Sequence, residues 1–365
     1  MILLEVTLAC DIIMNLRGPV RPAFYLAQGL INEGYEVSIL APKISTSMKN
    51  LLNAKGITPI ELSRLFIFEK LGGFPLWFEA WTHGAFLRFL SKRYRGSSVL
   101  VNFSHTLCIP SSYWYLQGPT FAALRDMEVE FDKKYKIGHK IMAPLLEYAD
   151  KKLIKKTREK TVFAIANSHF CASLYREIGI EVSRIIYPPI NTEIFHPLTS
   201  NPSSNYVLTY FGRETRFNVI RTLADLGITF IAFGSSWCTP RYLMRHPNIK
   251  FLGEISTKEL VHLYSNALFT LFAFTHEPFG YIPVESMACG TPVLTYNKQG
   301  PKESVIDGYS GWLVKRDHEI ISKALDIWNN GYHFSMRVNS VKTAQKFDKK
   351  LYIKKWMEIL YTHGL

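Results

Sequence analysis

The chain alternates short apolar segments with amphipathic ones, and this alternation limits its fold more than any other feature. Residues 1–9 are apolar, residues 24–31 carry apolar side chains at helical spacing, and residues 37–40 are apolar again. This strand–helix–strand order is typical of a βαβ unit with parallel strands. A second series of apolar segments and helical segments runs from residue 206 to residue 314. The sequence therefore predicts an α/β protein with two Rossmann-like domains.

A break between the two series lies at residues 196–205, which are rich in Pro, Ser and Asn. This composition is typical of a linker, and a length of 365 residues suits two domains. We predict an N-terminal domain at residues 1–195, a second domain at 196–345 and a final helix at 346–365. The apolar stripe of that helix is predicted at Leu351, Ile353, Trp356, Ile359 and Leu360.

Cysteines and hydropathy bear on the compartment. The five cysteines are scattered and form no C-x-x-C pair, which argues against a zinc site or a disulfide framework. No apolar run reaches the roughly 18 residues that a membrane span needs, and the first residues lack the basic region of a signal peptide. We expect a cytoplasmic protein. Peripheral attachment to the cytoplasmic face of the membrane is compatible with this location.

The net charge of +13 favours an anionic partner, and the excess is concentrated at residues 133–160, with ten basic and three acidic residues. Apolar side chains interleave with this run at amphipathic spacing, and residues 66–89 are rich in Phe and Trp. Both segments favour contact with an anionic membrane surface, and both are equally compatible with helices packed on a sheet. The basic residues do not alternate with aromatic ones, so no nucleic acid is expected.

The densest functional pattern lies at residues 276–314. Glu277 follows an apolar strand, and Glu285 lies one turn into a helix predicted at residues 282–289 and closed by Gly290. The helix N-terminus favours phosphate, and carboxylates accept hydrogen bonds from sugar hydroxyls. The spacing alone leaves a second interpretation open, in which both glutamates are solvent-facing residues at a helix start.

This segment resembles the signature of family 4 glycosyltransferases, which are retaining enzymes of the GT-B fold. The resemblance is close over residues 248–314 and recognisable over 166–197. It implies two facing Rossmann-like domains with a deep cleft between them, and a C-terminal helix that crosses back to the N-terminal domain. It also implies that a hexose moves from a nucleotide-diphosphate sugar, UDP- or GDP-linked, to an acceptor with retention of anomeric configuration.

The resemblance assigns roles in the second domain to several residues. Glu277 would contact hydroxyls of the donor sugar, and the amides of Phe279, Gly280 and Tyr281 would hold the sugar and the diphosphate. Glu285 would accept hydrogen bonds from the ribose.

Five further roles follow from the same resemblance. Gly212 and Arg213 would grip the diphosphate, and Ile255 would lie near the base. From the N-terminal domain, Gly18 would let the backbone approach the donor phosphate, and His105 would face the donor sugar as a catalytic residue with Glu277. The residues alone leave simpler roles open, which are a surface ion pair for Arg213, core packing for Ile255 and His105, and a turn for Gly18.

The chain departs from the family pattern in three places. No lysine follows Arg213, and Arg216 is the candidate for that cationic role because guanidinium pairs well with phosphate. The first loop lacks paired glycines, and Gln299 stands where a second glycine is common in the family.

The chain has no D-x-D motif, and Asp126-Met127-Glu128 is its nearest approach. We therefore predict transfer without a metal or other cofactor. The acceptor is expected to be a glycan or a lipid-linked molecule. Two alternatives stay open, which are a nucleotide-sugar epimerase of GT-B-like fold and a non-catalytic basic binding protein.

Overall fold

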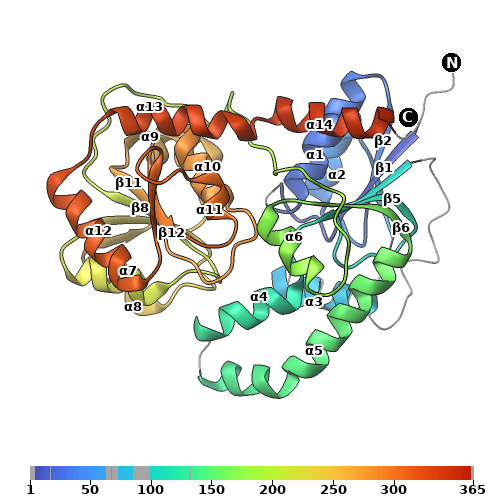
Figure 1. The fold of residues 1–365 in the computed structure, drawn as a ribbon, viewed down its shortest axis with the longest axis horizontal. Helices are drawn as coiled ribbons and strands as arrows, with labels where there is room; N and C mark the ends of the chain where they lie inside the picture. The colour runs from blue at the N-terminus through green and yellow to red at the C-terminus, as the bar shows by residue number, and fades with distance from the viewer. Residues whose placement is uncertain are drawn as a thin grey trace. The chain divides into compact units, whose positions relative to one another are not determined.

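The computed structural model describes residues 5–16, 18–62, 67, 73–84, 99–130 and 133–362 (Figure 1). The chain divides into two compact units. The first comprises Met1–Ala122, Gly138–Pro189 and Lys349–Leu365, and the second comprises Ala123–Ile137 and Ile190–Asp348. The predicted boundaries after residues 195 and 345 lie near these divisions, whereas segment 123–137 packs with the second unit although it interrupts the first in sequence.

The first unit is built on a parallel sheet with the described strand order β3-β2-β1-β4-β5-β6-β7. Its strands are β1 (Glu5–Ala9), β2 (Glu36–Ala41), β3 (Thr58–Glu61), β4 (Val99–Asn102), β5 (Ser111–Leu116), β6 (Thr161–Ala166) and β7 (Arg184–Ile185). Its helices are α1 (Val20–Asn32), α2 (Thr46–Ala54), α3 (Gly73–Thr82), α6 (His169–Arg176) and α14 (Lys349–Thr362). Two helices continue across the division between the units, namely α4 (Thr120–Met127) and α5 (Lys133–Glu159).

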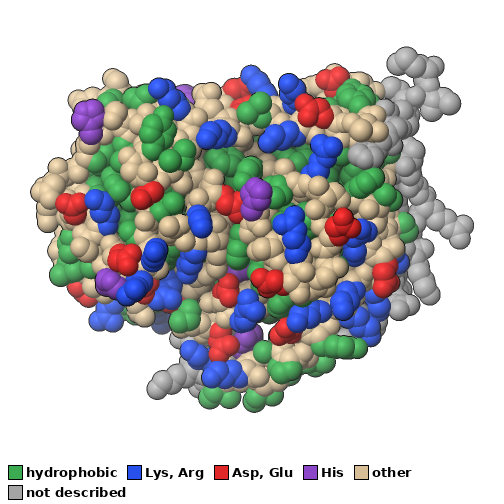
Figure 2. Space-filling view, in the orientation of Figure 1, with side chains coloured by type: hydrophobic (Ala, Val, Ile, Leu, Met, Phe, Trp, Pro, Cys, Tyr) green, Lys and Arg blue, Asp and Glu red, His purple; other side chains and the backbone are tan. Residues whose placement is uncertain are grey.

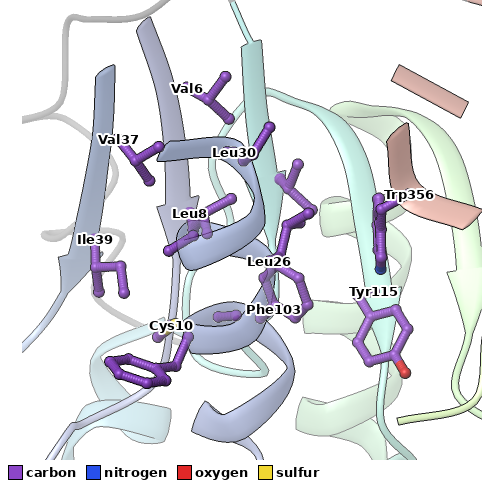
Figure 3. Close-up of a cluster of buried hydrophobic side chains, with 14 of the residues drawn as sticks. Val6, Leu8, Cys10, Leu26, Leu30, Val37, Ile39, Phe103, Tyr115 and Trp356 are labelled. Carbon is purple, nitrogen blue, oxygen red and sulfur yellow. The ribbon is translucent and has the colours of Figure 1, made fainter. Parts of the chain in front are cut away.

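The central strands of this sheet are buried along almost their whole length, as in β1 and β2. Near-continuous apolar strands are typical of parallel sheets that helices cover on both faces. One hydrophobic cluster joins strands, α1 and α14 (Figure 3), and it includes Val6, Leu8, Leu26, Leu30, Phe103, Tyr115 and Trp356.

Helix α14 lies beside α1 in the first unit (Figure 1). Gly29 of α1 permits this approach, because a Cβ there would lie 2.5 Å from Ile353 Cγ2. The predicted packing of the final helix on the N-terminal domain is therefore confirmed. The prediction for Leu351 is wrong, because its side chain is 45% exposed and the buried stripe runs through Tyr352 and Met357 instead.

The second unit repeats the same architecture with the strand order β10-β9-β8-β11-β12-β13, all parallel. Its strands are β8 (Val207–Phe211), β9 (Phe230–Gly234), β10 (Ile249–Phe251), β11 (Phe269–Phe272), β12 (Val293–Tyr296) and β13 (Gly311–Val314). Its helices are α7 (Phe217–Asp225), α8 (Arg241–Met244), α9 (Thr257–Asn266), α10 (Tyr281–Ala288), α11 (Pro301–Ser304), α12 (Asp317–Asn330) and α13 (Ser335–Ala344). Short 3₁₀ turns lie at Glu128–Glu130 and Gln345–Phe347. The predicted pair of Rossmann-like domains is thus confirmed.

Strand order reverses between β1 and β4 in the first sheet and between β8 and β11 in the second. In open parallel sheets the loops at the carboxyl ends of such strands diverge, and ligands bind there. These two places hold the sites described next.

No helix within the described ranges is both long and apolar enough to cross a membrane. The aromatic segment 66–89 was predicted to contact a membrane surface or to pack on the sheet. Only residues 67 and 73–84 of this segment are among the described residues, and the rest of the prediction lies outside them.

Candidate donor-binding and catalytic site

Two loops meet at the carboxyl edge of the second sheet, and we call them the paired loops, residues 212–216 and 273–280. They follow β8 and β11, which are neighbours where the strand order reverses. The backbone N–H of Thr275 donates a hydrogen bond to the Glu214 carbonyl oxygen at 2.7 Å. The topology therefore brings together two segments about 60 residues apart that carry most of the predicted donor-binding residues.

Gly212 turns the first of the paired loops away from β8. A Cβ at this position would lie 2.4 Å from Tyr210 Cε1 and 2.8 Å from Glu214 Oε2, so no other residue fits without rearrangement. The Gly212 N–H donates to the Thr215 hydroxyl at 2.8 Å, which closes the turn. Arg213 is therefore presented at the edge of the sheet by a fixed backbone.

The Arg213 guanidinium stacks on an aromatic ring. Its central carbon lies 4.9 Å from the centroid of the Trp237 ring, which belongs to the loop after β9 and is 75% exposed. Stacking of a cation on an aromatic face restricts the orientation of the guanidinium. The predicted grip of Arg213 on a diphosphate stays a prediction.

Arg216 has two carboxylate partners. It forms ion pairs with Asp317 at 2.5 Å and with Glu130 at 3.3 Å, and Tyr296 donates to the other oxygen of Asp317. Two carboxylates already balance the charge of this guanidinium. The predicted role of Arg216 as a cation that meets a diphosphate stays a prediction.

Glu277 lies in the second of the paired loops, where its carboxylate accepts hydrogen bonds from the backbone directly before α10. The Oε1 atom accepts hydrogen bonds from the N–H groups of Phe279 and Gly280 at 3.3 and 3.0 Å. Burial, and next the nearby Glu214 carboxylate, raise the pKa of Glu277 to about 8, although the two backbone hydrogen bonds oppose this shift. Burial also raises the pKa of Glu214. A carboxyl that titrates near neutral pH can both donate and accept a hydrogen bond at a reacting centre.

The loop between Glu277 and α10 is fixed by packing. Gly280 adopts φ +95°, a left-handed conformation that favours glycine, and the buried Phe279 ring packs against Tyr281 and Phe347. Two amides that were predicted to hold the donor, those of Phe279 and Gly280, point at the Glu277 carboxylate. Their predicted role with a donor stays a prediction.

Glu285 is only 2% exposed, which excludes the solvent-facing interpretation for this residue. It lies within α10, and the Tyr264 hydroxyl is 3.4 Å from its Oε2 atom. Ile255 follows β10 and is partly buried, directly before the capping box that Ser256 and Glu259 form at the start of α9. The predicted contacts of Glu285 with a ribose and of Ile255 with a base stay predictions.

The first unit places Gly18 and His105 in the loops that follow β1 and β4, at its own switch point. Gly18 adopts φ +49°, and a Cβ there would meet nothing within 4 Å. Its glycine is thus required by backbone conformation rather than by crowding. The His105 N–H donates to both carboxylate oxygens of Asp11, at 3.0 and 3.2 Å.

Asp11 holds the loop that carries His105, and sequence reasoning missed this role. Besides the His105 amide, its Oδ1 atom accepts hydrogen bonds from the Thr106 N–H at 3.0 Å, the Thr106 hydroxyl at 2.7 Å and the Ser104 hydroxyl. The available signal was an acidic residue directly after a buried strand. Burial raises the pKa of a second missed residue, Asp150, and the hydrogen bonds that it accepts from the Phe121 N–H and the Trp81 indole N–H, both at 3.0 Å, oppose this shift.

Asp126 and Gln299 form a third group that the sequence did not predict. Asp126 Oδ2 lies 2.9 Å from His276 Nδ1 and 3.2 Å from Gln299 Nε2. Burial alone would raise the pKa of Asp126. The hydrogen bond and charge of His276, and next the charge of Arg125, outweigh burial and lower this pKa below its ordinary value. Within the part of the chain that the structure describes, no three His, Cys, Asp or Glu side chains are arranged to hold a metal ion.

Solved glycosyltransferase structures share the whole fold. HepE of Anabaena, solved in complex with UDP-glucose, superposes with a TM-score of 0.68 at 16% identity, over 98% of this chain and 99% of that one. WaaG, a glycosyltransferase involved in lipopolysaccharide biosynthesis, gives a TM-score of 0.69 at 14% identity, over 97% and 99% of the two chains. These likenesses show that the chain has the GT-B fold.

The sequence match is narrower, and it includes the second of the paired loops, residues 273–280, but not the first, residues 212–216. Residues 243–347 match the family described as glycosyl transferases group 1.

Two curated relatives illustrate the match. The alpha-1,3/1,6-mannosyltransferase alg2 of Schizosaccharomyces pombe is 40% identical over 73 residues, which are 20% of this chain and 14% of that protein. A glycosyltransferase of Methanocaldococcus jannaschii is 25% identical over 287 residues, 71% of this chain and 78% of the other. The match to the mannosyltransferase covers only a small part of that protein, so it does not extend the activity of the mannosyltransferase to this chain.

Proposed function

We propose that the chain is a retaining glycosyltransferase that moves a hexose from a nucleotide-diphosphate sugar to an acceptor. The observation that carries this proposal is the meeting of the paired loops at the switch point of the second sheet. There Glu277, the Gly212–Arg213 turn and the N-terminus of α10 face one region of the sheet edge. UDP and UDP-glucose in the solved structures of HepE support a nucleotide sugar, UDP- or GDP-linked, as the donor.

The reaction must stabilise a leaving diphosphate. We propose that Arg213 and the partial positive charge at the start of α10 supply this stabilisation without a metal ion. The support comes from the residues themselves. The chain has no D-x-D motif, and Asp126 in its nearest approach is already bonded to His276 and Gln299. We propose that Glu277 and His105 contact the donor sugar.

The stereochemical test uses the purified chain with a UDP- or GDP-hexose and a chosen acceptor. We expect an NMR spectrum of the first product to show the anomeric configuration of the donor, and we expect EDTA to leave the rate unchanged. An inverted product would contradict the retaining mechanism, and loss of rate in EDTA would contradict metal independence. Incubation with the donor alone is the control, because an epimerase would convert it without an acceptor.

For the acceptor, we propose a lipid-linked molecule at an anionic membrane surface, because α5 carries an exposed apolar face. Its outward side chains recur at helical spacing, and they are Ile137, Ile141, Met142, Leu145 and Tyr148. In Figure 2, hydrophobic and basic side chains gather along the lower edge of the face shown, where α5 lies. Lysines flank the apolar face, and Lys152 lies over the Tyr148 ring.

The acidic side chains of α5 offset only part of this charge at the surface. Asp150 is buried, Glu147 is paired with Lys151, and Glu159 is exposed, against nine basic residues in the helix. An apolar face flanked by basic residues is typical of helices that lie in a membrane interface, where each basic residue adds about 1 kcal/mol on an anionic surface.

Substituting Ile141→Gln and Leu145→Gln together is expected to weaken binding to anionic vesicles at least about tenfold, because each side chain loses roughly 1.5–3 kcal/mol of apolar burial. Flotation with phosphatidylglycerol vesicles at low and high salt measures the effect. The matched control is Leu226→Gln. Leu226 is an exposed leucine at the C-terminal end of α7, away from α5 in sequence, and its substitution should leave vesicle binding unchanged. Absence of wild-type binding at low salt would contradict the membrane proposal.

A further inference from the structure

Gln299 combines an unfavourable backbone conformation with an unusually well-used side chain. It lies between β12 and α11 with φ +54°, and among the described residues only Ser204 shares a positive φ without being glycine. Residues other than glycine resist this conformation, so the presence of glutamine here points to a role for its side chain. The hydrogen bonds of the side chain give that reason.

The Gln299 amide group makes three hydrogen bonds. Its Oε1 atom accepts from the Glu277 N–H at 2.6 Å, and its Nε2 atom donates to Asp126 Oδ2 and to the Thr275 carbonyl oxygen, both at 3.2 Å. Asp126 is itself held by His276 at 2.9 Å. A chain of side-chain hydrogen bonds thus runs from Asp126 through Gln299 to the peptide of Glu277.

The neighbouring residue completes the hold on that peptide. The Gly300 N–H donates to the Glu277 carbonyl oxygen at 3.0 Å, so both backbone polar groups of Glu277 are bonded to residues 299 and 300. The Glu277 carboxylate is then directed back onto the amides of Phe279 and Gly280. With its backbone fixed on both sides, Glu277 has few ways to turn its side chain elsewhere.

We propose that Gln299 is a positioning residue, anchored by Asp126, that holds Glu277 in the orientation required for contact with the donor sugar. This inference rests on the proposed function, because it presumes that Glu277 meets the sugar. Gln299 acts through Glu277 and does not itself touch the reacting atoms. Glycine at this position would have no side chain to accept the hydrogen bond from the Glu277 N–H.

The test is Gln299→Gly, which removes the side chain and suits the left-handed backbone. We expect kcat to fall about 10- to 100-fold with little change in KM for the donor, because small misplacements of a catalytic group cost that much. We expect Tm to change little, because the backbone strain that glycine relieves at φ +54° offsets part of the cost of the three lost hydrogen bonds. A merely structural role would instead lower Tm and leave kcat near the wild-type value.

Two further variants make the test sharper. Asp126→Ala should also lower kcat, and the double variant should lose little more than either single one, because both act through the same hydrogen bonds. The matched control is Ser204→Gly, which relieves the other positive φ and should leave kcat unchanged. A Gln299→Gly variant with kcat within twofold of wild type would overturn the inference.

A second measurement does not depend on turnover. Hydrogen exchange of a peptide that spans residues 277–281 should be faster in Gln299→Gly than in wild type, because the Phe279 and Gly280 amides lose their fixed acceptor. If the wild type transfers no sugar, the proposed function fails, while this measurement still decides whether Gln299 holds Glu277. Unchanged exchange would overturn the positioning role on its own.

Discussion

Replacing Glu277 by Gln is expected to lower kcat for sugar transfer about 100- to 1,000-fold, which is the usual cost of removing one group that stabilises a transition state. Gln keeps the size of the side chain and an acceptor oxygen for the Phe279 and Gly280 amides. It cannot exchange a proton or carry a negative charge beside the donor sugar. The measurement is steady-state kinetics with a UDP- or GDP-hexose, and kcat within threefold of wild type would contradict the role of Glu277.

The pH dependence of Tm for the same variant tests whether the pKa of Glu277 is raised in the folded protein. Burial raises the pKa of Glu277 to about 8 from its ordinary value of 4.5. Between these pH values the folded protein holds a proton that the unfolded chain has released, so the wild-type free energy of unfolding falls as pH rises. Gln has no such dependence. We expect the Tm of Glu277→Gln to approach that of the wild type at pH 5 and to exceed it at pH 8.5, and a constant difference would contradict this account.

Substituting Gly300→Ala is expected to cost about 2–3 kcal/mol of stability and to lower Tm by about 4–12 °C. A Cβ at this position would lie 2.4 Å from both Phe279 Cα and the Pro278 carbonyl oxygen. These are backbone atoms, so no side chain can simply rotate away. The backbone of Gly300 is itself ordinary, at φ −59° and ψ −44°, so the whole effect comes from crowding. Activity should fall with it, because Phe279 lies beside Glu277.

The matched control is Gly138→Ala in α5, where a Cβ would meet nothing within 4 Å. Alanine is the better helix former there, so we expect Tm to stay the same or rise slightly. Thermal unfolding of both variants measures the contrast. Equal Tm values for the two variants would show that residues 299–300 do not press against the Glu277 loop as the structure indicates.

The sequence predicted the architecture well because buried parallel strands are written as short apolar runs. The strands that end near Phe211 and Phe272, and the helix after Glu277, were predicted from local pattern alone. Strand order was not visible in that pattern, yet it decides that the loops after β8 and β11 lie together. The final helix was predicted correctly as an element, but its register was wrong at Leu351 because one position turns a side chain by about 100°.

The supporting residues of the site could not be predicted because their partners are distant in sequence. Asp126 is 150 residues from His276 and 173 from Gln299, and no local pattern links them. Gln299 was noticed only as a departure from a glycine, and its φ of +54° shows why glycine would suit the position. Asp11 carried a weak signal as an acid after a buried strand, but its partners at residues 104–106 are visible only in the folded chain.

The packing of α14 against α1 has a consequence for the order of events during synthesis. Trp356 fills the space beside Phe103 and Tyr115, so the interior of the unit that emerges first stays incomplete until residues 349–362 have been made. Residues 190–348 leave the ribosome earlier and contain most of the second unit. The first unit can therefore complete its interior only after most of the second unit has been synthesised.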